Sequence, residues 1–261
     1  MKILSWDIGI KNLSYCLIEN NKIVDWDVIN LDDEEIIIKC NGEYKNGNKC
    51  KAKSVYLNKD KSCGYCKTHY KKLDESNNTN FKEVKKPKKK KINLLEVGNR
   101  LITELDKRFN SVKFDNVLLE NQPSLKNPTM KSVQIIIFSY FLINGYNKDT
   151  IKHIQMISAT QKNKYCNNYC KLNTHIELPT TKSSYNNAKK TAILVTDDIL
   201  KKIYDDVGET DDVVETHDVG ETDDVVGVIV NAINYHIFFK EHKKKDDLAD
   251  SYLQGIQFLQ K

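Results

Sequence analysis

The sequence lacks any long hydrophobic run. No stretch of its 261 residues approaches the roughly 20 apolar residues of a membrane-spanning helix, so we expect no membrane partner. The apolar run in the opening MKILSWDIGI is too short and too acidic for a secretory signal, and the segment lacks the Arg- and Ser-rich character of a transit peptide. We therefore expect a protein that is not secreted and that acts in the cytoplasm or the nucleus.

Several familiar catalytic patterns are also missing. The chain shows no P-loop, no dinucleotide-binding fingerprint and no serine–histidine triad. Its seven cysteines suit a reducing compartment, where thiols bind metal, better than they suit a disulfide framework. The cysteines therefore point to metal binding.

Lysine and arginine are missing from one segment. Residues 205–224 carry ten carboxylates and neither basic residue, whereas the whole chain has a formal net charge of +5. The rest of the chain is thus strongly basic, which favours a polyanionic partner because each phosphate that is neutralised releases counterions. A merely soluble, Lys-rich protein has the same composition, so charge alone leaves both interpretations open.

The acidic segment also contains an internal repeat. DVGETDDVV occurs at 206–214 and again at 218–226. Two copies are fewer than a stacked repeat fold needs. We interpret residues 205–224 as an expanded acidic surface loop. The alternative is that this segment mimics DNA and covers the basic surface of the protein.

Short apolar runs predict how the fold begins. Residues 2–7, 12–19 and 22–31 have the composition of strands and are separated by turn-prone residues. Connections this short permit only hairpins, so we expect an antiparallel meander whose first strand ends at Asp7.

Helices and strands alternate later in the chain. From Ile92 to Phe109 the apolar residues recur at three- and four-residue steps, which predicts a core-facing helix. Further strands are expected at 114–120 and 150–159, and further helices at 128–144 and 183–204. Residues 225–242 and 246–260 are expected to form one helix, or two helices broken near residues 243–245. An antiparallel start followed by this alternation predicts an α/β fold with a mixed sheet and helices on its faces.

Residues 40–91 differ from both of their neighbours. They are rich in Cys, Lys and Gly, and they end in the run KKPKKKK at 85–91, which is typical of a solvated linker, a nuclear localisation signal or a DNA-binding tether. We therefore divide the chain into a first core part at 1–39, an inserted module with its linker at 40–91, and the rest of the core at 92–261.

Five metal-binding side chains gather within the insertion. Thiolates and imidazoles in a short polar segment are typical of structural zinc, which takes four ligands. We expect these to be Cys40, Cys50, Cys66 and His69, with Cys63 as the alternate. Free cysteines in a loop are the other interpretation, and the weaker pair of Cys166 and Cys170 is expected to be buried or incidental.

Four carboxylates stand at the ends of predicted elements. Asp7 and Glu120 close two strands, whereas Asp247 and Asp250 are three residues apart and would share one face of the last helix. Hydrolysis of a phosphodiester by divalent cations needs carboxylates from several elements. Each residue alone could instead be a cap or a turn former. Asp246 points about 100° away from Asp247 in a helix and is a reserve candidate.

Three sequence motifs surround these carboxylates. They are, in order, WDIGIKNLSYCLIE, LLENQPS and KKKDDLADSYLQ. Together they resemble the motifs of RuvC-type Holliday junction resolvases, especially the poxvirus and giant-virus branch and its fungal mitochondrial relatives. The resemblance covers most of the chain outside 40–91 and 205–224. It implies a ribonuclease H-like, mixed five-stranded sheet flanked by helices, with the zinc-binding module as an addition to the resolvase plan.

The resemblance also implies a mechanism. Asp7, Glu120, Asp247 and Asp250 would hold two Mg²⁺ or Mn²⁺ ions, one activating water and the other stabilising the leaving 3′ oxygen. A homodimer would nick opposite strands of a four-way DNA junction symmetrically. A viral replication site in the cytoplasm would suit such an enzyme.

Four further side chains are candidates for contact with DNA, and all of them lie within the three motifs. The resemblance implies that Lys11, Gln122 and either Lys244 or Lys245 approach the scissile phosphate. The lysines could equally make general contacts with the backbone of the DNA.

Two other functions compete with junction resolution. The first is a different ribonuclease H-like nuclease, acting on flaps, on RNA–DNA hybrids or in transposition. The second is a non-catalytic, zinc-containing DNA-binding protein. Four acidic residues argue against the second, because a protein that only binds DNA gains nothing by burying carboxylates near phosphate.

Overall fold

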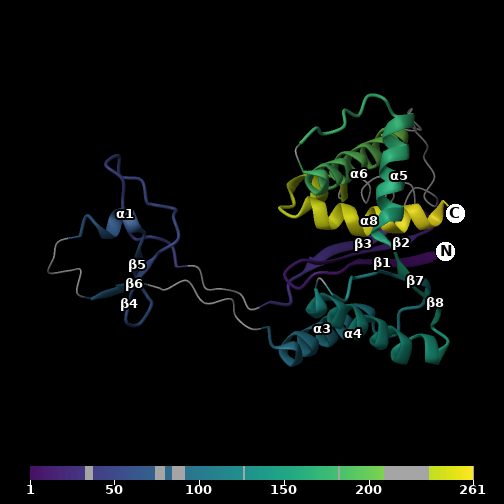
Figure 1. Cartoon of the computed structure of the whole chain (residues 1–261), viewed down its shortest axis with the longest axis horizontal. Helices are drawn as coiled ribbons and strands as arrows, with labels where there is room; N and C mark the ends of the chain where they lie inside the picture. Colours follow the sequence, from purple (N-terminus) through teal and green to yellow (C-terminus); the bar gives the residue numbers. More distant parts are fainter. Residues whose placement is uncertain are drawn as a thin grey trace, which may run out of the picture. The chain divides into compact units, whose positions relative to one another are not determined.

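The computed structural model describes residues 1–32, 38–73, 80–83, 92–125, 127–181, 183–208 and 235–260. The chain forms two compact units (Figure 1). The core unit comprises Met1–Asp32 and Asn93–Lys261, and the inserted unit comprises Asp33–Ile92. The inserted unit thus begins earlier than residue 40.

A mixed five-stranded sheet forms the centre of the core unit. Its strands are β1 (Lys2–Asp7), β2 (Leu13–Glu19), β3 (Lys22–Ile29), β7 (Phe114–Glu120) and β8 (Ile151–Ile157), in the order β3-β2-β1-β7-β8. Strands β1, β2 and β3 form the expected antiparallel meander, and β7 and β8 continue the sheet in parallel with β1. The predicted fold class is confirmed.

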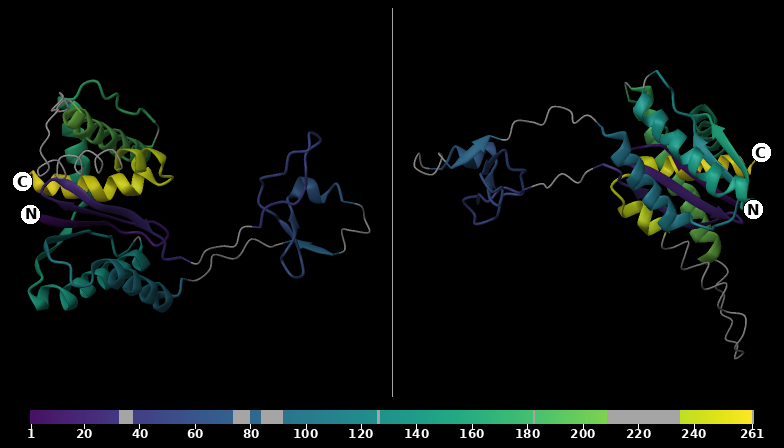
Figure 2. Two further views of the ribbon diagram at one scale, coloured as in Figure 1. Left: turned by 180° about the vertical axis from the view of Figure 1, so that it is seen from behind. Right: turned by 90° about the horizontal axis from the view of Figure 1, so that it is seen from below.

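Helices cover both faces of the sheet, as Figure 1 and Figure 2 show. One face carries α3 (Leu94–Phe109) and α4 (Pro128–Asn144), and the other carries α5 (Ala159–Leu172), α6 (Ser184–Gly208) and α8 (Lys245–Leu259). Because both faces are covered, β1 and β2 are buried along almost their whole length, and they have continuous apolar runs in place of strict alternation. Each face has its own hydrophobic cluster.

Local signals explain the limits of the helices on the first face. The side chain of Asn93 accepts a hydrogen bond from the backbone N–H of Leu95 at the start of α3, and Pro128 opens α4. Both are favourable at a helix N-terminus because the first N–H groups have no partner within the helix. The boundaries of α4 were therefore readable from the sequence.

Helix α5 was not anticipated. Residues 150–159 were expected to be one strand, but β8 ends at Ile157 and Ser158 caps the new helix by accepting a hydrogen bond from the N–H of Thr160. Ser158 is followed three residues later by Gln161, and this spacing is a start signal for a helix. That signal was available in the sequence.

The acidic segment was expected to be a loop throughout, and this was wrong at its beginning. Helix α6 continues through Gly208, so residues 205–208 are helical. The remainder of the repeat and the first part of the helix expected at 225–242 lie outside the described residues, and 235–241 are helical. Within the described part of the chain, no helix is long and apolar enough to cross a membrane.

The inserted unit has a small sheet of its own. Strands β4 (Tyr56–Asn58), β5 (Gly64–Tyr65) and β6 (Phe81–Glu83) pair in the order β5-β4-β6, and α1 (Lys67–Tyr70) follows β5. The aromatic rings of Tyr56 and Tyr70 stack with their centroids 3.6 Å apart. The composition had predicted metal ligands here but no strands. The lysine run at 85–91 lies outside the described residues.

Candidate metal-dependent nuclease site

Asp7 and Glu120 lie next to each other because their strands are parallel neighbours. The register between β1 and β7 pairs Trp6 with Leu119, so the next residue of each strand is a carboxylate at the same edge of the sheet. Gln122 donates a hydrogen bond from Nε2 to Glu120 Oε2 at 3.0 Å, and its backbone N–H donates to Gln134 Oε1. Gln122 therefore orients Glu120.

Helix α8 brings the other two carboxylates to this edge. It packs closely on the sheet because Gly255 leaves room for Ile18, whose Cδ1 lies 2.6 Å from where a Cβ would stand. The hydroxyl groups of Ser251 and Ser14 are hydrogen bonded at 2.8 Å. These contacts fix the helix so that one of its faces presents Asp247 and Asp250 toward β1 and β7.

All four carboxylates line one cavity of about 580 Å³. The expected set of Asp7, Glu120, Asp247 and Asp250 is therefore brought together by the fold. Lys11 and Gln122 also line the cavity, whereas Lys244 and Lys245 are not among its lining residues.

The carboxylates in the cavity raise one another's pKa. Burial, followed by the charges of Glu120 and Asp250, raises the pKa of Asp7 well above its usual value. Burial also raises the pKa of Asp250. Burial and the neighbouring charge of Asp246 raise the pKa of Asp247 to about 6. The cavity therefore concentrates negative charge that lacks sufficient compensation from the protein.

The donor set fits divalent cations. Asp247 Oδ2 is buried and has no hydrogen-bond partner among the described residues. An orphaned carboxylate oxygen beside three other carboxylates is costly unless a cation compensates it. Hard cations such as Mg²⁺ and Mn²⁺ prefer oxygen ligands of this kind. The four residues could therefore hold such ions.

Lys162 on α5 is a member of the site that the sequence did not reveal. Its side chain is buried, and Nζ lies 2.9 Å from Asp250 Oδ1. Burial alone would lower the pKa of this lysine, but the neighbouring carboxylates outweigh burial and raise it. Lys162 is thus a permanently charged group inside the cavity.

Removing the charge of Lys162 is expected to destabilise the core unit. Lys162→Met leaves Asp250 buried without its partner, which typically costs about 3–5 kcal/mol. We expect this loss in urea denaturation at pH 8 with EDTA, and a smaller loss as the pH is lowered, because burial raises the pKa of Asp250 and protonation would remove its unpaired charge. Lys164→Met, on the exposed side of the same helix, is the control. Equal stability of the two variants would contradict this assignment.

The reserve candidate Asp246 is directed elsewhere. Its Oδ2 lies 2.5 Å from Lys189 Nζ, and it does not line the cavity. Lys189 lowers the pKa of Asp246, although burial opposes this shift. The helical geometry thus separates Asp246 from Asp247, as the spacing indicated.

The raised pKa of Asp247 predicts a dependence of stability on pH. An acid whose pKa rises from about 4 to about 6 on folding binds protons more tightly in the folded state, so without metal the stability increases as pH falls from 7 to 5. Asp247→Asn should flatten this rise and increase Tm by about 2–4 °C at pH 7 in EDTA. Thermal unfolding across this pH range measures both effects, and a wild-type Tm that falls over the same range would contradict the prediction.

Lys11 is on the rim of the cavity. Its Nζ lies 3.0 Å from Asp32 Oδ2, and its side chain is 68% exposed. An exposed lysine at the mouth of an acidic cavity is able to reach a phosphate that enters it.

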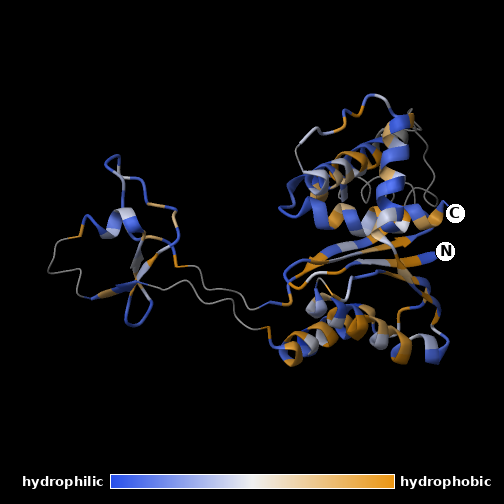
Figure 3. Ribbon diagram, in the orientation of Figure 1, coloured by the Kyte–Doolittle hydropathy of each residue, from blue (hydrophilic) through white to orange (hydrophobic). Residues whose placement is uncertain are grey.

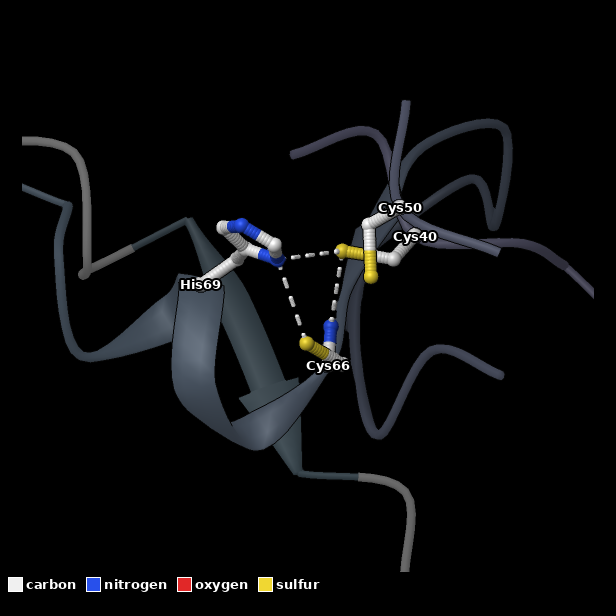
Figure 4. Close-up of side chains that lie close together, drawn as sticks. All are labelled: Cys40, Cys50, Cys66 and His69. Carbon is white, nitrogen blue, oxygen red and sulfur yellow. Dashed lines mark hydrogen bonds between the residues drawn. The ribbon is translucent and has the colours of Figure 1, made fainter. Parts of the chain in front are cut away.

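The inserted unit contains the second candidate site. Its ligand atoms all lie within 4.8 Å of one another, and they belong to Cys40, Cys50, Cys66 and His69. Figure 4 shows these four side chains pointing toward one another. The alternate ligand, Cys63, is outside the group, and its backbone N–H donates to Asn58 Oδ1 at 3.0 Å.

The surroundings of this group favour metal binding. A hydrogen bond from the Tyr44 hydroxyl lowers the pKa of Cys50 to about 6, so this thiol is ionised at neutral pH, as zinc requires. His69 Nε2 lies 3.1 Å from the carbonyl oxygen of Glu43. That hydrogen bond leaves Nδ1 facing the sulfur atoms of Cys40 and Cys66, which is how a second shell usually orients a ligand histidine.

The fold and the carboxylate cavity together define a class of protein. A mixed five-stranded sheet in this strand order, with carboxylates from two central strands and a covering helix, is ribonuclease H-like. Residues 3–124 match the family model described as "Mitochondrial resolvase Ydc2 / RNA splicing MRS1". The first two of the three motifs lie within the matched residues, and the match supports the resemblance to the RuvC-type resolvases.

Two individual proteins are also similar. "Uncharacterized protein L451" of Acanthamoeba polyphaga mimivirus is 25% identical over 340 aligned residues, which cover 100% of this chain and 75% of that protein. The crystal structure of the yeast mitochondrial Holliday junction resolvase Ydc2 aligns with 98% of this chain and 78% of its own, with a TM-score of 0.45 and 15% identity.

Proposed function

We propose that this chain is a divalent-metal-dependent endonuclease that cuts DNA at four-way junctions. The observation that carries the proposal is the convergence of four carboxylates from two strands and one helix on a single cavity. The match to a resolvase family supports a branched substrate, and the mimivirus relative supports a place in the giant-virus branch.

The side chains of the cavity have separate tasks in this proposal. Asp7, Glu120, Asp247 and Asp250 would hold two Mg²⁺ or Mn²⁺ ions. When bound, such cations lower the pKa of water and stabilise negative charge on the scissile phosphate. Lys162 holds Asp250 in place by their ion pair.

Contact with the DNA backbone is proposed for groups at the rim. Lys11 lies at the mouth of the cavity and Gln122 lies beside Glu120. Lys244 and Lys245 stand at the start of α8, outside the lining of the cavity, where they would contact the flanking phosphates.

A second copy of the chain is the proposed partner of α3 and α4. Figure 3 shows that α4 is largely hydrophobic, whereas α3 carries both hydrophobic and hydrophilic residues. The side chains of Ile102, Ile135 and Ile143 are 42%, 45% and 58% exposed, and they line one shallow groove. A helix that is apolar on its outer side as well as its inner side usually has a protein partner. A homodimer formed there would supply two cavities for two symmetric nicks.

Charges placed in this groove are expected to separate the dimer. In Ile135→Glu/Ile143→Glu, two carboxylates would have to be buried without partners, which an interface rarely tolerates. Light scattering after size exclusion should give the mass of a monomer, and coordinated double nicking should become single nicking. Leu172→Glu, at a site on α5 that is 85% exposed, should leave the dimer intact. A monomeric wild type would contradict the proposed interface.

Cleavage of a substrate panel tests the proposed function. Purified protein with Mg²⁺ is incubated with a four-way junction, a flap, an RNA–DNA hybrid and a linear duplex of shared sequence. We expect paired nicks at symmetric positions of the junction alone, with 5′-phosphate ends. Equal cutting of all four substrates would indicate another ribonuclease H-like nuclease, and binding without cutting would indicate a non-catalytic protein.

The inserted unit is proposed to bind one structural Zn²⁺. Three thiols and an imidazole in a short polar unit are a complete ligand set for zinc. Such an ion would supply folding energy that a unit with so few aliphatic residues lacks.

A further inference from the structure

A hairpin in the inserted unit has two chemically different faces. Isolated antiparallel bridges pair Lys39 with Lys53 and Glu43 with Lys49. Two hydrogen bonds of 2.8 Å lie between these bridges, from the N–H of Cys40 to the carbonyl of Ala52 and from the N–H of Cys50 to the carbonyl of Gly42. Residues 39–53 therefore form a continuous antiparallel ribbon.

Side chains alternate across this ribbon. In an extended strand, successive side chains point to opposite sides. Cys40, Gly42 and Cys50 are buried on the side of the metal-binding group, whereas the alternate residues are exposed. Those exposed residues include four lysines, which we call the lysine face: Lys39, Lys49, Lys51 and Lys53.

The inserted unit carries an excess of positive charge. On the ribbon, Lys39 is opposite Lys53 and Glu43 is opposite Lys49. The described residues of the inserted unit contain eleven lysines and three carboxylates. This excess of lysines would attract a polyanionic ligand.

We propose that the lysine face binds the phosphodiester backbone of duplex DNA. Lysines two residues apart on a strand are about 6.7 Å apart, which is close to twice the axial rise of about 3.4 Å per phosphate on one DNA strand. A row with this spacing matches the regular charge of the DNA backbone. Lysine is a point charge that contacts phosphate and does not read base edges.

This binding site deepens the proposed function, on which it rests for the choice of DNA. The lysine face would hold an arm of the substrate without regard to sequence, while the core unit selects the branch point. The metal-binding group on the opposite face keeps the two strands of the ribbon together. Binding energy from this face is therefore electrostatic and dependent on salt.

The test compares two sets of charge-removing substitutions in the full chain. The first triple variant is Lys39→Gln/Lys49→Gln/Lys51→Gln. The matched control is Lys59→Gln/Lys71→Gln/Lys72→Gln, which removes the same charge from other segments of the same unit. Both are made in an Asp7→Asn background so that binding is measured without cleavage. Fluorescence anisotropy gives Kd for a four-way junction, a linear DNA duplex and an RNA duplex between 50 and 200 mM KCl.

The first triple variant is expected to raise Kd at least tenfold for both DNA substrates. The slope of log Kd against log salt should fall by about 2–3, since each lost phosphate contact contributes about 0.9. The control should change Kd less than threefold. A Lys→Arg triple at the first three positions keeps the charge and should bind like the parent. Zinc content, measured for every variant, should be unchanged.

Three results would overturn the lysine face as a DNA site. They are an unchanged salt slope in the first triple variant, equal losses in both Gln triples, and an Arg triple that binds as weakly as the Gln triple. Tighter binding of the RNA duplex than of the DNA duplex would overturn the choice of DNA. If the chain does not cut junctions, the binding measurements still decide whether the lysine face binds DNA. The two proposals can therefore be contradicted independently.

Discussion

Asp7→Asn and Glu120→Gln are each expected to reduce the rate of junction cleavage by about three orders of magnitude or more. Both residues lie at the point where β1 and β7 end side by side, and each substitution removes a carboxylate from the cavity. Catalytic groups that act as a unit lose most of their effect when one member is removed. Single-turnover cleavage with Mg²⁺ at saturating enzyme measures the loss.

Two controls separate chemistry from folding. Kd for the junction should change less than threefold in both variants, since the amide side chains keep their shape. Asp246→Asn is the matched control, because Asp246 adjoins Asp247 but does not itself line the cavity and is paired with Lys189. Near-normal cleavage by the Asp7 or Glu120 variant would exclude the carboxylate cavity as the active site.

Removing the metal from the inserted unit is expected to unfold that unit alone. Structural zinc contributes about 10–16 kcal/mol to the folding of small zinc domains, and Cys66→Ser removes one of four ligands. Limited proteolysis should then cut within 38–73 while the core unit remains intact. Hydrogen exchange should show the same division, since the two units have separate cores.

Cys63→Ser is the control for the zinc prediction. Cys63 directly precedes β5, three residues before Cys66, and is not among the four clustered ligands, so this variant should keep its zinc and its resistance to protease. A folded Cys66→Ser protein that contains no zinc would contradict the structural role of the metal.

Much of the fold could be predicted because its signals are local. The strand at 114–120 and the helix at 128–144 have the bounds expected from the sequence. Pro128 and the apolar run that ends at Glu120 define these limits without any tertiary information. Helix α5 was missed because its start signal, Ser158, directly follows β8. The predicted strand was therefore extended to residue 159, past the true end of β8.

The candidate site was harder to predict because it depends on which strands are neighbours. Nothing local to Asp7 or Glu120 indicates that β1 pairs with β7, and the resemblance to resolvases supplied that step. Lys162 could not be predicted, since its burial depends on how α5 and α8 pack. The catalytic roles of these residues stay predictions.

In the inserted unit, too, the sequence predicted some features and not others. The ligand set followed from the spacing of Cys40, Cys50, Cys66 and His69. The lysine face could not be predicted in this way. Its lysines lie on one face only if residues 39–53 form an antiparallel ribbon, and the sequence did not show that they do. A lysine-rich composition alone is equally typical of a solvated linker.

Binding of Mn²⁺ tests the central claim most directly, since it reports on the cavity without any assumption about the substrate. The electron paramagnetic resonance signal of free Mn²⁺ is followed as protein with its zinc retained is added at pH 7.5. We predict that wild type removes up to two equivalents of Mn²⁺ from solution and that Asp7→Asn binds at least tenfold more weakly, with Asp246→Asn like wild type. Equal Mn²⁺ binding by wild type and Asp7→Asn would contradict the claim that these carboxylates form a metal-dependent nuclease site.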